Sequence, residues 1–154
     1  RLIAMIEKYC DNKIPQVAKD NELAQSLTQT VKTADDAICA LDFQSGINAI
    51  MDFCKQVNGY VTIKQPWVVA KDAANKAELD EILYNTAESL RALAVLLHPV
   101  MPEVTEKLWQ SLGASSLGAI GDQQISKVSN WGQLPAGSVV TKTEVLFPRL
   151  EEVK

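Results

Sequence analysis

The sequence predicts an all-α protein: an antiparallel bundle of four to five helices followed by an irregular C-terminal arm. Two observations support this fold class. Through most of residues 1–112, apolar residues recur three or four positions apart, which is the period of one helix face. From residue 114 to residue 137 the composition shifts to Gly, Ser, Asn and Gln with little periodicity. We therefore divide residues 1–154 into a bundle core, 1–112, and a loop-rich arm, 113–154.

The first two predicted helices are separated by a turn. Leu2, Ile6 and Tyr9 lie on one face of an opening helix. Residues 11–15 break that period, because Asp and Asn favour turns and a proline pushes the residue before it out of helical space. A second, amphipathic helix fits residues 21–41, and Asp20 is available as its N-cap.

Prolines and glycines set the limits of the later helices. A third helix begins near Ile47 and is predicted to end at Asn58-Gly59, a pair typical of a helix stop. Pro66 then starts a short helix at its first turn. The longest helix is predicted from about residue 79 to residue 97, and another runs from Pro102 to a stop at Gly113. Within the arm, residues 139–140 and 145–147 form either a short extended pair or a tail docked on the bundle.

Composition excludes several classes of protein. The 154 residues, with 47% hydrophobic content, suit one soluble domain. One histidine and three widely spaced cysteines exclude a His-rich metal centre, a disulfide framework and a four-ligand zinc site, so we expect no metal. No apolar run of 18 residues or signal segment occurs, so we expect a cytoplasmic protein with no membrane partner. The net charge of −4 argues against broad phosphate binding and against DNA, but permits a small, specific RNA contact.

No catalytic motif is present. The sequence lacks a glycine-rich phosphate loop, a nucleophile elbow, a paired-histidine zinc helix and a calcium loop. His98, at a helix end, is predicted to satisfy the last carbonyls of its helix. Cys39 and Cys54 are predicted to pack as small hydrophobes, whereas Cys10 near a helix end is more exposed.

Among the tryptophans, Trp67 has the most unusual position. It follows a proline at a chain reversal, and three lysines lie nearby in the sequence: Lys55, Lys64 and Lys71. A rigid aromatic side chain near several cations suits stacking on an unpaired base while the lysines hold its phosphate. The alternative is core packing against Val61 or Val68, and the residues alone leave both open. Trp109 is predicted to be core, and Trp131 to pin the arm to the bundle.

Several blocks together resemble the anticodon-binding domain of bacterial methionyl-tRNA synthetase. They follow the family's order across nearly the whole chain: the opening residues 1–15, Tyr60, Pro66-Trp67, Leu90-Arg91-Ala92-Leu93, Leu96-Leu97-His98-Pro99-Val100-Met101-Pro102, Leu112-Gly113 and Leu146-Phe147-Pro148-Arg149-Leu150-Glu151. A single block is unspecific, whereas several at compatible spacings are specific.

The resemblance implies which residues contact RNA. In this family an arginine and an asparagine, four residues apart on the first bundle helix, read the CAU anticodon together with the tryptophan that follows a proline. Trp67 and Pro66 match that pair, Arg1 matches the arginine, and the asparagine falls four residues before Arg1, ahead of this sequence. Phe147 and Arg149, in the returning Leu-Phe-Pro-Arg segment, are implied interdomain contacts.

The resemblance also implies a wider activity. It identifies the chain as the C-terminal part of a class I methionine-tRNA ligase whose separate catalytic domain binds ATP and methionine. This chain lacks the His-Ile-Gly-His and Lys-Met-Ser-Lys-Ser signatures, so we expect no cofactor and no aminoacylation here. The expected partners are the anticodon loop of methionine tRNA and the catalytic domain of the same polypeptide. Two alternatives remain: the equivalent domain of another class I synthetase, and a helical protein-interaction module without RNA binding.

Overall fold

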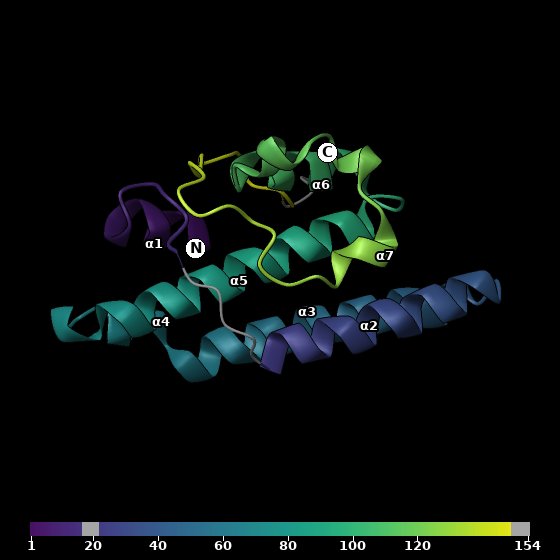
Figure 1. The fold of residues 1–154 in the computed structure, drawn as a ribbon, viewed down its shortest axis with the longest axis horizontal. Coiled ribbons are helices and arrows are strands. Elements are labelled where there is room, and N and C mark those ends of the chain that lie inside the picture. The colour runs from purple at the N-terminus through teal and green to yellow at the C-terminus, as the bar shows by residue number, and fades with distance from the viewer. Residues whose placement is uncertain (17–21, 149–154) are drawn as a thin grey trace, which may run out of the picture.

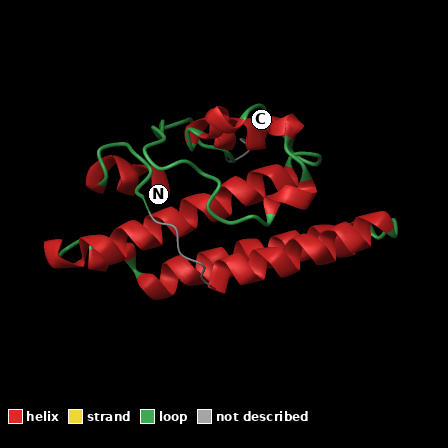
Figure 2. Cartoon of the chain, viewed as in Figure 1, coloured by secondary structure: helices red, strands yellow, loops and turns green. Residues whose placement is uncertain are grey.

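The computed structural model describes residues 1–16 and 22–148, and its regular structure is helical (Figure 2). Within those residues the α-helices are α1 (Leu2–Tyr9), α2 (Glu22–Cys39), α3 (Phe43–Lys64), α4 (Pro66–Val69), α5 (Lys76–Leu97), α6 (Pro102–Ser111) and α7 (Ile125–Val128). Three short 3-10 segments join them: η1 (Ala73–Asn75), η2 (Ala114–Leu117) and η3 (Ile120–Asp122). The predicted all-α class is confirmed.

The helices are arranged in layers, with α5 in the middle (Figure 1). On one side of α5, the helices α2 and α3 form a long antiparallel hairpin; on the other side lie α1, α6 and the arm. Fifteen of the 22 residues of α5 are buried, because neighbours cover it on both sides. One hydrophobic core therefore extends to both sides of this helix.

The turn between α2 and α3 is tightly hydrogen-bonded. The N–H of Leu41 donates to the carbonyl of Ile38, and the N–H of Asp42 to that of Ala37, both at 2.9 Å, which is a Schellman turn. Leu41 has a φ of 63°, in the left-handed region that glycine usually occupies. The carboxylate of Asp42 then accepts the N–H of Ser45 at 3.1 Å and caps α3.

Helix α3 continues beyond the end predicted at Gly59, so that prediction is wrong. A Cβ at Gly59 would meet nothing within 4 Å, so this glycine serves no close contact. The buried side chains of Val57 and Tyr60 hold the backbone helical on either side, and their packing outweighs the low helix propensity of glycine. The chain leaves the helix at Gln65, where φ is 45°, immediately before Pro66.

Most other predicted limits are confirmed within one turn of helix. Helix α5 ends at Leu97, and α6 begins at Pro102 and is followed by Gly113 with a φ of 68°. Helix α2 begins and ends within the predicted range. Asp20, the predicted cap of α2, lies outside the described residues.

A buried ionic cluster on α5 holds the arm in place. Glu88 and Arg91 form an ion pair at 3.0 Å, with side chains 0% and 1% exposed. The Glu88 carboxylate also accepts three backbone N–H groups of the arm at 2.9–3.0 Å, from Gly132, Gln133 and Leu134. Arg91 donates to the carbonyl of Val128 at 3.0 Å. We call these α5 side chains and their arm partners the arm clamp.

The arm is docked on the bundle, which was one of the two predicted alternatives. Its Val140 is buried, and the N–H of Val140 donates to the carbonyl of Asn12 at 2.8 Å. The predicted core position of Trp109 is confirmed, since it is 1% exposed and its indole N–H donates to Gly118 at 3.1 Å. Trp131 packs half-buried against the core, as predicted for a residue that pins the arm.

Candidate nucleic-acid interface

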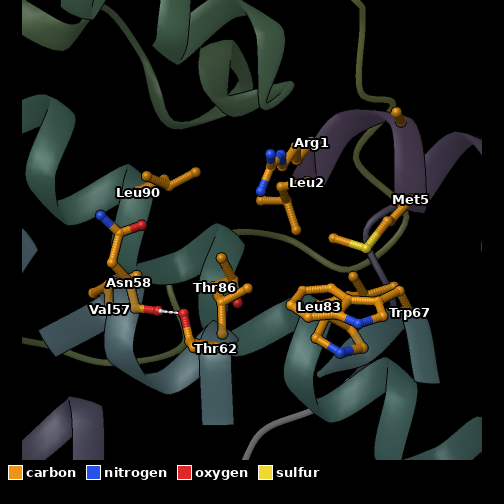
Figure 3. Close-up of a pocket in the computed structure, with 13 residues that line it drawn as sticks. Arg1, Leu2, Met5, Val57, Asn58, Thr62, Trp67, Leu83, Thr86 and Leu90 are labelled. Carbon is orange, nitrogen blue, oxygen red and sulfur yellow. Dashed lines mark hydrogen bonds between the residues drawn. The ribbon is translucent and has the colours of Figure 1, made fainter. Parts of the chain in front are cut away.

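A candidate site is a hollow of about 600 Å³ near one end of the bundle. Its walls come from the start of α1, from α3, from α4 and from α5 (Figure 3). The lining is mainly apolar, with a few polar side chains, which is the usual character of a ligand site. Trp67 and Arg1, both predicted from the sequence, line it together. We call it the Trp67 hollow.

The joint between α3 and α4 places the indole. Gln65 takes a left-handed conformation, and the buried Pro66 occupies the first turn of α4. The N–H groups of Val68 and Val69 donate to the carbonyl of Gln65 at 2.7 and 3.2 Å, which fixes this turn. Trp67 therefore stands at the edge of the bundle, and 46% of it is exposed. Sequence reasoning left core packing open for Trp67; the structure contradicts that alternative.

Arg1 lies across the hollow from Trp67 (Figure 3). The carbonyl of Arg1 accepts the N–H of Met5 at 3.1 Å, so this residue is held at the first turn of α1. The side chain of Arg1 is exposed and carries five N–H donors in a fixed fork. A planar aromatic ring and a planar cation thus share one opening. The fold brings Arg1 and Trp67 to the same hollow, although 65 residues separate them in the chain.

The three predicted phosphate contacts differ in position. Lys64 and Lys71 are exposed on either side of α4, and the ammonium of Lys64 lies 6.0 Å from the centre of the Tyr60 ring. Lys55 sits farther along α3 and forms an ion pair with Asp52 at 2.7 Å. Lys64 and Lys71 are therefore placed beside Trp67 in the chain, whereas the charge of Lys55 is already engaged.

Sequence reasoning missed the polar side chains that α3 and α5 add to the hollow. Asn58 and Thr62, one turn apart on α3, line it, and the Thr62 hydroxyl donates to the carbonyl of Asn58 at 2.9 Å. Thr86 of α5 lines it as well. The four-residue spacing of Asn58 and Thr62 places both side chains on one helix face. A helix that is predicted to end at Gly59 does not include Thr62, so the sequence prediction does not pair them.

Of the two predicted interdomain residues, only Phe147 belongs to the part of the chain that the structure describes. Phe147 is 66% exposed near the end of the arm. Arg149 lies outside the described residues. Phe147 is not among the residues that line the Trp67 hollow. Their contact with another domain stays a prediction.

His98 and the cysteines lie outside the hollow. The ring of His98 bonds through Nδ1 to the Thr105 hydroxyl at 2.9 Å, so it joins α5 to α6 rather than satisfying the last carbonyls of its own helix as predicted. Cys39 is exposed at the end of α2, which contradicts its predicted packing, while Cys54 packs partly against the core. Burial raises the pKa of Cys10 to about 11, with the Asp80 carboxylate adding to the rise.

Residues 1–16 and 22–148 contain neither a candidate metal-binding cluster nor a helix suited to crossing a membrane. In that part of the chain no group of three or more His, Cys, Asp or Glu side chains is arranged to hold a metal ion. Among the same residues, no helix combines the length and apolarity needed to cross a bilayer.

Comparison with known proteins places the chain beside tRNA ligases. The family model described as the anticodon-binding domain of tRNA ligase matches residues 20–148. The methionine–tRNA ligase of Streptomyces coelicolor is 52% identical over 160 residues, covering 99% of this chain and 30% of the relative. The methionine–tRNA ligase of Halalkalibacterium halodurans is 36% identical, covering 98% of this chain and 23% of the relative. The chain thus spans less than a third of these relatives.

Solved structures show the same similarity. The apo form of Mycobacterium tuberculosis methionyl-tRNA synthetase superimposes with a TM-score of 0.81 and 26% identity, covering 98% of this chain and 30% of that one. The same synthetase bound by methionyl-adenylate gives a TM-score of 0.79 over 96% of this chain. The fold described above is thus found within longer synthetase chains.

Proposed function

Because this chain belongs to the anticodon-binding domain family of tRNA ligases, we propose that it binds the CAU anticodon loop of methionine tRNA as the C-terminal helical domain of a methionine–tRNA ligase. One observation carries the proposal: Trp67, 46% exposed, and Arg1 line the same hollow near one end of the bundle. ATP and methionine then bind a part of the ligase outside this chain, in the cytoplasm, where its free cysteines suit a reducing setting.

The chemistry of the hollow suits single-stranded RNA. An anticodon base that leaves the stack gains roughly 1–3 kcal/mol by lying on an indole face, and this gain depends little on which base it is. Choice among bases then comes from hydrogen bonds to their edges. Arg1 supplies donors, the Asn58 amide supplies a donor and an acceptor, and the Thr62 hydroxyl, whose proton bonds the Asn58 carbonyl, supplies an acceptor on the walls of the same hollow.

Electrostatics are compatible with a local contact. The net charge of −4 makes non-specific attraction to RNA small. Lys64 and Lys71 flank α4 in the sequence and remain exposed, so a loop seated on Trp67 brings phosphates within their reach. With so few phosphates contacted, affinity should fall only shallowly with salt.

Quenching of tryptophan fluorescence tests the proposal directly. A Trp131→Phe background removes the half-buried indole of the arm, and Trp109 is buried, so the signal reports mainly on Trp67. We expect quenching by an anticodon stem-loop with CAU, and weaker binding when the first anticodon base is changed. Absence of quenching supports instead a protein-interaction module without RNA binding. Quenching that ignores the anticodon contradicts the proposed anticodon recognition, and preference for another anticodon supports another class I synthetase.

A substitution series assigns the effect to the site. In a binding assay that does not rely on fluorescence, Trp67→Ala should weaken the CAU loop by about 5- to 150-fold, the equivalent of one lost stacking contact. Val68→Ala is the matched control, because Val68 is similarly exposed at 45% but does not line the hollow. Arg1→Ala should reduce the preference for CAU more than the affinity itself.

A further inference from the structure

An apolar surface stands exposed at the turn of the α2–α3 hairpin. The large apolar side chains there are 37–75% exposed: Ile38, Leu41, Phe43, Ile47 and Met51. We call these five side chains the hairpin tip. Three of them, Phe43, Ile47 and Met51, repeat every four residues and so share one face of α3. Clustered exposed apolar residues of this kind mark interaction sites rather than ordinary surface.

The rest of the bundle leaves this face uncovered. Figure 1 shows that the hairpin extends past the end of α5 on the side where α5 turns into α6. Farther along α3, where α5 runs beside it, Phe53 and Val57 are 0% and 5% exposed. The exposed α3 side chains of the hairpin tip thus lie on a face of α3 next to the buried face that contains Gly46 and Ile50, and the bundle leaves this neighbouring face uncovered.

The conformation of Leu41 adds a second observation. This residue is 75% exposed and occupies the left-handed region, with a φ of 63°. Glycine fits the Schellman position without the strain, about 1–2 kcal/mol, that a side chain adds there. A leucine that exposes most of its surface in a strained backbone contributes nothing evident to the packing of the bundle, so its side chain points to a contact with another surface.

The charges around the hairpin tip limit what that surface is. Residues 33–54 contain four aspartates and no lysine or arginine. Lys32 and Lys55, just outside, pair with Asp36 and Asp52 at 3.2 and 2.7 Å. Asp42 is held ionised, because the hydrogen bond from Ser45 lowers the pKa of its carboxyl. A negative rim repels RNA phosphates and favours a protein surface that carries lysine or arginine.

We propose that the hairpin tip docks on the part of the ligase polypeptide that lies outside this chain, in an apolar site rimmed by basic side chains. This inference rests on the proposed function, and on the observation that the curated relatives extend to more than three times the span matched here. The tip and α4 lie at opposite ends of the bundle (Figure 1). The ligase body therefore holds one end while the Trp67 hollow at the other stays open to RNA.

The exposed Cys39, at the end of α2 beside the hairpin tip, provides a natural reporter. Its alkylation by iodoacetamide is measured without RNA in the 154-residue chain and in the intact ligase. We expect Cys39 to react at least about tenfold more slowly in the intact ligase, because docking shields it. Phe43→Asp should restore the fast rate in the ligase. Ile63→Asp, at an apolar position that is also exposed, at 79%, near the other end of α3, should leave the protection unchanged.

Three results would overturn the proposal. The first is an unprotected Cys39 in the ligase. The second is protection in the 154-residue chain alone that grows with its concentration, which indicates a second copy. The third is protection that survives Phe43→Asp. Since no RNA is present, these outcomes are separate from the anticodon assay. Loss of anticodon discrimination with Cys39 still protected would reject the proposed function and keep the docking surface.

Discussion

Loss of the Glu88 carboxylate should destabilise the fold strongly. Its carboxylate is fully buried and is shared between Arg91 and three backbone N–H groups of the arm. Replacing it by glutamine places an amide NH₂ where only acceptors fit and leaves Arg91 charged without a counter-ion. Removing one partner of such a buried pair costs about 3–5 kcal/mol.

We therefore expect Glu88→Gln to lower the free energy of unfolding by roughly that amount, measured as a shift in the urea midpoint. Asp36→Asn is the matched control, because it breaks an exposed pair with Lys32 and should cost less than about 1 kcal/mol. A loss no larger than that of the control would contradict the buried-pair account. Glu88→Gln combined with Arg91→Met should recover part of the stability.

Individual residues also show where sequence reasoning succeeds. The short helix that begins at Pro66 follows from the sequence, whereas the exposure of Trp67 does not, because the residues alone leave core packing open. The arm clamp could not be predicted in this way. Glu88 and Arg91 lie three residues apart on a helix, which reads as an ordinary surface pair, and their burial depends on an arm that arrives about 40 residues later in the chain.

At the scale of the elements, Gly113 controls how the arm leaves α6. It has a φ of 68°, and a Cβ there would stand 2.5 Å from the carbonyl oxygen of Val139, which is backbone and has little freedom to move. Gly113→Ala should therefore cost about 2 kcal/mol or more in unfolding free energy, from conformational strain and the clash together.

Gly137 provides a matched comparison within the same arm. Its φ is 80°, so alanine is strained there too, but no atom lies within 4 Å of the added Cβ. Calorimetry or chemical denaturation of Gly137→Ala should show only the conformational part, about 1–2 kcal/mol. Equal losses at the two glycines would show that the Val139 clash contributes nothing.

The elements also explain why the end of α3 was mispredicted and that of α6 was not. Gly113 ends a helix because the backbone there must turn left-handed against the arm. Gly59 follows an asparagine and is therefore also a typical helix stop in the sequence. The buried side chains of Val57 and Tyr60 nevertheless keep the backbone helical there. Local sequence identifies residues that permit a stop, whereas packing decides which of them is used.

For the whole molecule, the structure predicts sensitivity to alkali. Burial raises the pKa of Tyr84 to about 12, and the nearby Glu88 carboxylate adds to the rise. The folded state thus retains this proton at a pH where the unfolded chain has lost it, so the stabilisation is full below pH 10 and declines as pH rises towards 12. The slope from one such group is at most about 1.4 kcal/mol per pH unit.

Urea denaturation between pH 9 and pH 12 measures this effect. Tyr84→Phe should flatten the decline, while lowering stability at neutral pH because its hydroxyl no longer donates to the Leu134 carbonyl at 3.1 Å. An unchanged alkaline slope in Tyr84→Phe would assign the decline to other groups. Tyr60, whose pKa is also raised by burial, is the next candidate.

Helix α5 has a practical consequence for anyone redesigning this protein. Leu83, Thr86 and Leu90 form the floor beneath the proposed RNA ligand, and Tyr84, Glu88 and Arg91 interleave with them to anchor the arm. Helix α5 thus determines both the depth of the Trp67 hollow and the attachment of the arm. Substitutions of Leu83, Thr86 or Leu90 that aim to change the anticodon preference will therefore lower thermal stability as well, whereas substitutions of the exposed Trp67 on α4 leave the buried side chains of α5 in place.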